Sequence, residues 1–330
     1  MTGGSGLVGQ WLLAALVRDG ARVRASYRGA LPALPDGTPA NAIEWLEGDV
    51  LDSLFLQRAV TDVDVVIHTA ALVSFAPRDA PRLWQTNVEG TANVVNALLT
   101  HAPTARLLHL SSVAALGPPA PGTTTVDETT QWDPAADHST YAESKFTAEL
   151  EVWRGLNEGL LGAIVNPSII IGPGDPTRSS TQLFRYAAEQ HRYYPPGRVN
   201  LVDVREVVFA LLALATAPAA QLGARYVLSA GTLPYAEFFE LAATALGRRP
   251  PRTALPTALA EILWRAEAVR ARLTGAAPLL TRETARIARR TAIFDGGRAA
   301  RTLGVTYRPP AESVTWCARE LRRHGLGAAS

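Results

Sequence analysis

The chain opens on a glycine-rich stretch, TGGSGLVG, which restricts the possible folds more than any other feature. Gly4, Gly6 and Gly9 have the spacing G-x-G-x-x-G, and Gly3 precedes them, so the backbone can turn tightly and approach a phosphate closely. The following segment, GLVGQWLLAALVRDG, has apolar residues at helical spacing and ends at Gly20. The N-terminus of such a helix directs N–H groups and a positive dipole end at an anion. The pattern predicts a turn that binds the pyrophosphate of a dinucleotide.

Strand-like and helix-like segments alternate over the first 170 residues. The strand-like segments are apolar enough to be buried, which is typical of a parallel sheet covered by helices on both faces. The sequence therefore predicts an α/β fold. The expected strands are ARVRASYR, AIEWLEGD, DVDVVIHTAA, ARLLHLSS and LLGAIVNPSIIIGPGD, and the expected helices after the first include LWQTNVEGTANVVNALLTHA and STYAESKFTAELEVWRGLNEG.

The pattern changes after about residue 170, where helical segments dominate and strand-like pieces are short. We therefore predict a dinucleotide-binding domain over residues 1–170 and a smaller, mostly helical substrate-binding lobe over 171–330. Residues 199–217 are expected to return to the first domain. The strongly apolar helix expected around Ile262–Leu273 is interpreted as packing over a substrate cleft, with a position on a membrane surface as the alternative.

Composition excludes several classes of protein. The net charge of +2 is too small to indicate a nucleic-acid partner, and no apolar run reaches the roughly 18 residues that span a bilayer. Cys317 is the single cysteine, so no intrachain disulfide can form, which favours a reducing compartment. We expect a cytoplasmic enzyme with a small-molecule substrate and no metal site.

Residues at the ends of the expected strands indicate which dinucleotide binds. The strand ARVRASYR is followed by Arg28, where sites that prefer NAD carry an acidic residue for the ribose 2′-hydroxyl. An arginine suits a 2′-phosphate, so NADP is predicted, with NAD as the alternative. Asp49 ends the next strand and is expected to accept a hydrogen bond from the adenine, whereas Asp52 is expected to cap a helix.

The segment YAESK carries the expected catalytic chemistry. Tyr141 and Lys145 are four residues apart and share one helix face. A nearby ammonium favours the phenolate and lowers the pKa of the tyrosine, which makes it usable as a general acid or base. Lys145 is the only lysine in a chain with many arginines, which favours a functional role. Ser111 and Ser112 follow a buried strand, at the sheet edge where ligands of open α/β sheets bind.

These motifs together resemble the extended short-chain dehydrogenase/reductase family, from Thr2 to VNLVDVREVV and more loosely beyond. The matching segments are TGGSGLVG, GDVLD, HTAA, NVEGT, LSSVAALG, YAESK and NPSIIIGPGD. The resemblance implies a Rossmann-type doubly wound parallel sheet and often a homodimer. It also implies that Tyr141 is the catalytic acid/base, that Lys145 binds the nicotinamide ribose, and that Ser112 orients the substrate. The residues expected to contact the cofactor are Gly3, Gly6, Leu7, Val8, Gly9, Arg28, Asp49, Val50, Thr69, Ala70, Ala71, Asn87, Tyr141, Lys145, Pro167 and Ser168.

Two segments indicate which branch of this family the chain resembles. Val113 and Ala114 stand where sugar-nucleotide dehydratases carry an Asp-Glu pair, so dehydration is not expected. The run VNPSIIIGPG is similar to that of dihydroflavonol reductases, aldehyde reductases and 3β-hydroxysteroid dehydrogenases. The leading prediction is hydride transfer between NADP(H) and an aldehyde, a ketone or a secondary alcohol. The alternatives are a nucleotide-sugar 4-epimerase, with Arg178, Arg185 and Arg198 over the diphosphate, and a non-catalytic NADPH sensor.

No strand precedes the glycine turn, although such turns follow a central strand of the sheet. Without that strand, the strands ARVRASYR and DVDVVIHTAA would flank an empty slot. The expectation is therefore that the first strand is missing through a misassigned start, with a GTG valine codon written as Met1.

Overall fold

The computed structural model describes residues 1–32, 34–35, 37–256, 259, 264–265, 270 and 292–327. A four-stranded parallel sheet has the order β10-β6-β4-β3, and a parallel pair, β1-β2, lies beside it. The predicted α/β class with parallel strands is confirmed. The strands are β1 (Val23–Tyr27), β2 (Ile43–Glu47), β3 (Val65–His68), β4 (Arg106–Leu110), β6 (Leu161–Pro167) and β10 (Ala224–Leu228).

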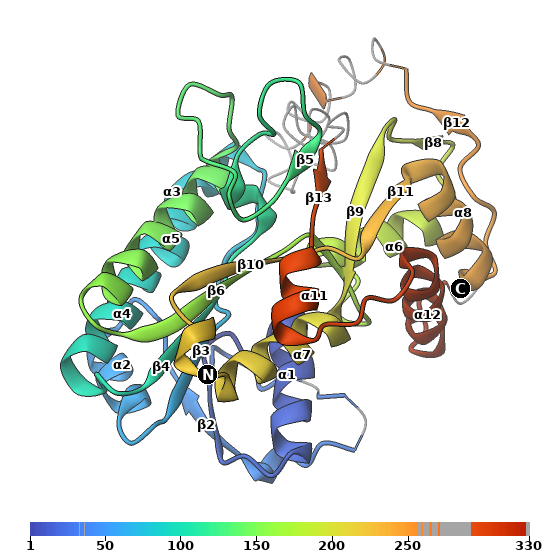
Figure 1. Cartoon of the computed structure of the whole chain (residues 1–330). Coiled ribbons are helices and arrows are strands. Elements are labelled where there is room, and N and C mark those ends of the chain that lie inside the picture. Colours follow the sequence, from blue (N-terminus) through green and yellow to red (C-terminus); the bar gives the residue numbers. More distant parts are fainter. Residues whose placement is uncertain are drawn as a thin grey trace.

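Helices cover both faces of this sheet, because successive strand residues point to opposite sides. Val66 and Leu107 pack against one helical layer, and their neighbours Ile67 and Leu108 pack against the other. Figure 1 shows the first layer at the left of the molecule. The first layer contains α2 (Ser53–Val60), α4 (Gly90–His101) and α5 (Thr140–Asn157), and the second contains α1 (Leu7–Arg18), α7 (Val204–Thr216) and α11 (Gly297–Leu303).

Met1 and Thr2 lie between β1 and β3, where the sequence predicts an empty slot. The Ser26 N–H donates to the Met1 carbonyl, and the Thr2 N–H donates to the Ile67 carbonyl at 3.0 Å. Thr2 forms an isolated parallel bridge with His68. These two residues therefore link β3 to β1 and bring the six parallel strands into one continuous order.

The helix expected over residues 83–102 has an irregular course. It starts earlier, in α3 (Ala80–Leu83), continues through a π-helical turn (Trp84–Glu89), and ends as α4. A π turn widens the helix by one residue and so rotates the side chains that follow it. Asn87 lies inside this turn and is buried.

The second lobe contains more strands than the sequence predicts. β7 (Ile169–Ile171), β9 (Arg198–Asp203) and β11 (Gly231–Pro234) form their own sheet, so the expected strand over 160–175 is divided at Ser168. Of residues 199–217, α7 packs on α1, whereas β9 pairs with β7 and β11. The lobe also holds α6 (Gln182–Ala188), α8 (Tyr235–Leu246) and α12 (Pro310–Arg323), with the short pair β8 (Tyr193–Tyr194) and β12 (Thr253–Ala254).

The two halves meet where α1 approaches α12. The Trp11 and Trp316 rings lie edge to face with centroids 5.6 Å apart, and the Arg205 guanidinium lies 3.7 Å from the Trp316 ring centroid. A further short pair joins β5 (Thr125–Val126) to β13 (Ile293–Phe294), as Figure 1 shows. The helix expected around Ile262–Leu273 lies almost wholly outside the described residues. Among the described helices, none is both long and apolar enough to cross a membrane.

Candidate active site

The glycine turn is packed so closely that larger residues do not fit. Gly3 has φ +76°, and a Cβ there would lie 2.6 Å from the Ala70 nitrogen. A Cβ on Gly9 would collide with the Gly3 carbonyl. Gly6 is the N-cap of α1 and has no side chain to cap the helix, and its own N–H donates to the Gly3 carbonyl at 3.0 Å. The N-terminus of α1, with Leu7 and Val8 in its first turn, therefore presents N–H groups suited to a pyrophosphate.

The segment after β3 holds this turn in place. The Thr69 hydroxyl donates to the Thr2 carbonyl at 2.8 Å, and the Thr69 N–H donates to the same oxygen. Ala70 follows beside Gly3, and Ala71 is exposed. The small residues of HTAA thus bring this part of the backbone close to the glycine turn.

Arg28 and Asp49 lie together at the ends of β1 and β2. The Arg28 guanidinium donates to the Asp49 carboxylate at 2.7 Å, and the two side chains are 65% and 34% exposed. Asp49 also accepts from the Leu51 N–H at 3.0 Å. Val50 is buried against Gly90, at the start of α4. The two residues predicted for the 2′-phosphate and for the adenine therefore form one ion pair.

Asn87, which is expected to contact the cofactor, makes its hydrogen bonds within the protein. Its amide oxygen accepts from the Leu72 N–H at 2.7 Å, and its amide nitrogen donates to the Leu72 carbonyl and to the Ser144 hydroxyl, both at 3.0 Å. Asn87 thus joins the segment after β3 to helix α5.

Tyr141 and Ser112 come together at the carboxyl ends of the strands. Tyr141 lies in the first turn of α5, which Ser139 caps by accepting from the Ala142 N–H. Burial raises the pKa of Tyr141, and a hydrogen bond with Ser112 lowers it in part. The Phe75 ring lies edge to face with the Tyr141 ring at 5.6 Å. The structure thus places a protonated phenol beside a hydroxyl and an apolar ring.

Lys145 lies deeper than the sequence suggests, and the expectation that it lowers the tyrosine pKa is wrong for this structure. Its side chain is 1% exposed, and its ammonium donates to the Leu110 carbonyl at 3.0 Å, at the end of β4. Burial lowers the pKa of Lys145 to about 8, and the negative charge of Glu149 opposes this change. The dominant influence on Tyr141 is its own burial.

Pro167 and Ser168 lie at the end of β6, as predicted, and both are buried. The Ser168 N–H donates to the Leu228 carbonyl at 2.9 Å. Its hydroxyl is buried and has no hydrogen-bond partner among the described residues. An unsatisfied buried hydroxyl at this edge and the tightly packed glycine turn are features that a bound dinucleotide would fit.

The sequence did not predict several buried polar residues that lie near Lys145. His68 and His109 are neighbours on β3 and β4, with ring centroids 5.2 Å apart, and burial lowers the pKa of both. Glu149, Asn166 and Arg225 form a second group behind the lysine. Only Glu149 had a local signal, since it stands four residues after Lys145 on the same helix.

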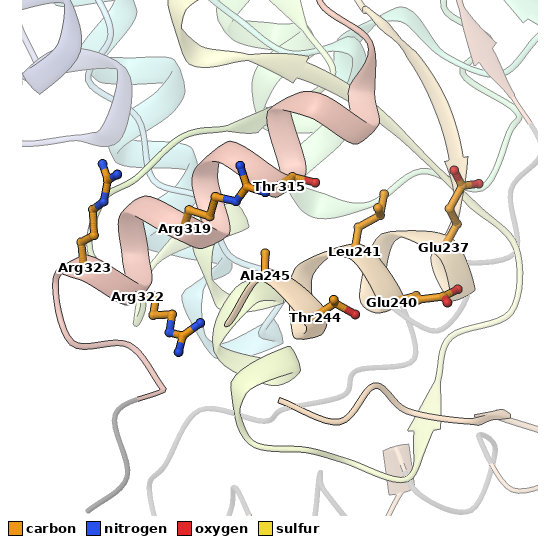
Figure 2. A pocket seen from close by; sticks show the side chains of 9 residues that line it. All are labelled: Glu237, Glu240, Leu241, Thr244, Ala245, Thr315, Arg319, Arg322 and Arg323. Carbon is orange, nitrogen blue, oxygen red and sulfur yellow. The ribbon is translucent and has the colours of Figure 1, made fainter. Parts of the chain in front are cut away.

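A separate hollow of about 840 Å³ lies between α8 and α12 in the second lobe. Figure 2 shows Arg322 and Arg323 at one end of this hollow and Glu237 at the other. None of the residues predicted for the cofactor or for the chemistry lines it. The candidate active site is therefore the region around the glycine turn and Tyr141.

Comparison with known proteins identifies this fold as that of the extended short-chain dehydrogenase/reductase type, NAD-dependent enzymes that include reductases and epimerases. The family model of the NAD dependent epimerase/dehydratase family matches residues 1–229, and the chain belongs to that family. A Synechocystis protein named "Putative dihydroflavonol 4-reductase" is 30% identical over 330 residues, which cover 98% of this chain and 94% of the relative.

Solved structures extend the comparison over nearly the whole fold. The crystal structure of gox2253 is 28% identical with a TM-score of 0.78, and the match covers 98% of both chains. MoeE5 in complex with UDP-glucuronic acid and NAD is 23% identical with a TM-score of 0.75, again covering 98% of both chains. The similarity to MoeE5 shows a shared fold. The family and the structures together support a nicotinamide cofactor.

Proposed function

We propose that this protein is an NADP-dependent reductase of an apolar aldehyde or ketone, or catalyses the reverse oxidation. The observation that carries the proposal is the partly buried Tyr141 phenol, whose raised pKa is lowered in part by Ser112 and whose ring lies edge to face with Phe75. A phenol whose pKa is raised by burial holds its proton until a developing alkoxide takes it. Ser112 stabilises that alkoxide by donating a hydrogen bond.

The nicotinamide, when bound, supplies or accepts the hydride. The protein binds and orients it: the glycine turn and the N-terminus of α1 hold the pyrophosphate, and Lys145 binds the nicotinamide ribose. Tyr141 and Lys145 are carried on one helix face, so the proton donor and the ribose ligand have a fixed relation. The Ser168 hydroxyl is available on the same edge of the sheet.

Arg28 supports NADP over NAD. Its guanidinium is 65% exposed at the end of β1, and one of its N–H groups bonds to Asp49. A guanidinium has five N–H donors, so it retains donors for a 2′-phosphate while Asp49 positions it.

Two observations favour the reductase over the nucleotide-sugar epimerase. The arginines expected over a diphosphate have other contacts: Arg178 and Arg185 pair with Asp175 and Glu189. Arg198 donates to the Thr232 carbonyl at 3.3 Å. The relative named as a reductase also covers almost the whole chain at 30% identity.

The same proposal includes a cytoplasmic location and a homodimer. The single cysteine, Cys317, is buried and unoxidised, which suits a reducing compartment. Trp84 and Leu150 are large apolar side chains that are 44% and 48% exposed near helix α5, as in a surface that a second copy covers. Sedimentation equilibrium would test the dimer.

The test of the function is Tyr141→Phe, assayed with NADPH and NADH against a panel of apolar aldehydes and ketones. Loss of the proton donor should reduce turnover by about 10²–10⁴-fold and leave NADPH binding intact. Tyr186→Phe is the matched control, because Tyr186 donates to the Tyr193 carbonyl in the second lobe. Wild-type turnover in Tyr141→Phe would refute the assignment. Tightly bound NAD that is never consumed would favour the epimerase, and NADPH binding without any turnover would favour the sensor.

A further inference from the structure

A buried polar cluster lies behind Lys145, on the side away from Tyr141. Lys145 and Glu149 are one helical turn apart on α5, and each is 1% exposed. Asn166 on β6 is fully buried, and Ser111 is 6% exposed at the end of β4. Buried charges are costly unless other groups compensate them, so this cluster requires an explanation.

Glu149 is held on the side opposite the lysine by residues of β6 and β10. The Asn166 amide donates to one carboxylate oxygen of Glu149 at 2.5 Å, and an Arg225 nitrogen lies 3.7 Å from the other oxygen. Arg225 also donates to the carbonyls of Glu128 and Thr130, at 3.0 and 2.8 Å. The carboxylate is therefore held from the side of β6 and β10, one helical turn along α5 from Lys145.

The groups around Lys145 determine whether its side chain is charged, and Glu149 is one of them. Burial favours the neutral amine of Lys145, and Glu149 is the group that favours the ammonium. Burial also raises the pKa of Glu149, and the contacts with Ser111 and Asn166 and the charges of Arg225 and Lys145 oppose this change and favour the carboxylate. The neighbouring groups on the sheet do not help, since His68 on β3 and His109 on β4 are neutral imidazoles whose pKa values are lowered by burial and by Lys145. Tyr141 precedes the lysine on α5 as a neutral phenol, and Arg225 on β10 is a cation beyond Glu149.

We propose that Glu149, anchored by Asn166 and Arg225, is a positioning residue that keeps the Lys145 ammonium charged and directed at the end of β4. This inference rests on the proposed function only in giving Lys145 a role in the reaction. The coupling between the two side chains is a property of the protein without substrate or cofactor.

The chain offers an unusually direct test, because Lys145 is its only lysine. Protein grown with lysine labelled with ¹³C at Cε has one lysine signal, whose chemical shift against pH reports the titration of Lys145. The wild-type midpoint is expected at about 8. In Glu149→Gln the midpoint should fall by about one pH unit or more, because the amide keeps the shape and removes the negative charge.

Glu143→Gln is the matched control, with the same change of charge at an exposed position of the same helix, and its midpoint should equal that of the wild type. Glu149→Asp keeps the charge at a greater distance and should restore most of the wild-type value. It also carries the test if Glu149→Gln does not fold. An unchanged or raised midpoint in Glu149→Gln, or a full loss in Glu149→Asp, would overturn the proposal.

The titration separates this proposal from the proposed function. A lowered midpoint in Glu149→Gln together with normal turnover in Tyr141→Phe would leave the coupling standing and refute the reductase chemistry. An unchanged midpoint in Glu149→Gln together with lost turnover in Tyr141→Phe would overturn the coupling and support the reductase chemistry.

Discussion

The two halves of the molecule bury different kinds of side chain. The core around Lys145 includes buried polar residues on three strands and two helices, among them His68, His109 and Asn166. The core of the second lobe is instead largely apolar and is rich in aromatic residues such as Phe184, Phe238 and Phe239. Polar groups lower the stability of a core unless they are paired, so a protein retains them where they serve a purpose. The difference indicates that the first half gives up stability for the site, while the core of the second lobe is stabilised mainly by aromatic and aliphatic packing.

The largest expected effect concerns stability in the second lobe. Phe238 is fully buried and lies edge to face with Phe184 and Phe239, at 5.4 and 5.2 Å. Phe238→Ala should lower the free energy of unfolding by about 3–5 kcal/mol, because it removes apolar contacts and leaves a cavity. Urea denaturation followed by tryptophan fluorescence measures this change.

Phe209→Ala on α7 is the matched control, since Phe209 is 48% exposed. It should cost less than about 1 kcal/mol. Similar losses of unfolding free energy in the two variants would contradict the comparison of the two halves, because the aromatic core would then contribute no special stability.

The next effect is a loss of folding stability in acid, which we expect from the buried histidines of the first half. Burial lowers the pKa of His68 to about 3 and that of His109 well below its usual value, whereas unfolded histidines titrate near 6.5. Unfolded chains therefore bind more protons below pH 6.5, and stability is lost as the pH falls from 6.5 towards 3. Between pH 7.5 and pH 5 each buried imidazole should cost about 2 kcal/mol.

His109→Leu sharpens this test, because neither ring nitrogen of His109 has a hydrogen-bond partner among the described residues. The variant should lose about 2 kcal/mol less than the wild type between the two pH values, as measured by urea denaturation. His101→Leu, at an exposed position of α4, should behave like the wild type. Equal losses in His109→Leu and the wild type would mean that the buried histidine pair does not limit acid stability.

The smallest effect separates the two cofactors. Arg28→Ala should weaken NADPH binding about tenfold and leave NADH binding unchanged, because only NADPH carries the 2′-phosphate. Fluorescence titration of each cofactor measures the two affinities. Arg18→Ala removes the same charge at the exposed far end of α1 and should change neither. An equal loss for both cofactors would show that Arg28 acts through Asp49 on a shared part of the site.

The sequence predicted features that depend on residues close together in the chain. The glycine spacing predicted the turn and helix α1, and apolar patterning predicted the parallel strands. The four-residue spacing of Tyr141 and Lys145 predicted their common helix face. It did not predict that the burial of Tyr141 itself raises the pKa of this tyrosine.

Other features depended on partners far away in the chain. The sheet β7–β9–β11 joins three short segments, residues 169–171, 198–203 and 231–234, whose pairing with one another the sequence did not predict. Asn87 lies in the π turn and accepts a hydrogen bond from the Leu72 N–H, which the sequence did not predict. Such contacts are chosen by packing between distant segments, which local periodicity does not encode.

By itself, the sequence determined the glycine turn, the parallel α/β class and the common helix face of Tyr141 and Lys145. Local chain geometry decides these features, because glycine, helix period and strand period act within a few residues. The tertiary structure decided how Lys145 is charged. Glu149, Asn166 and Arg225 lie on α5, β6 and β10, and only the folded sheet brings the three together behind the lysine and away from water.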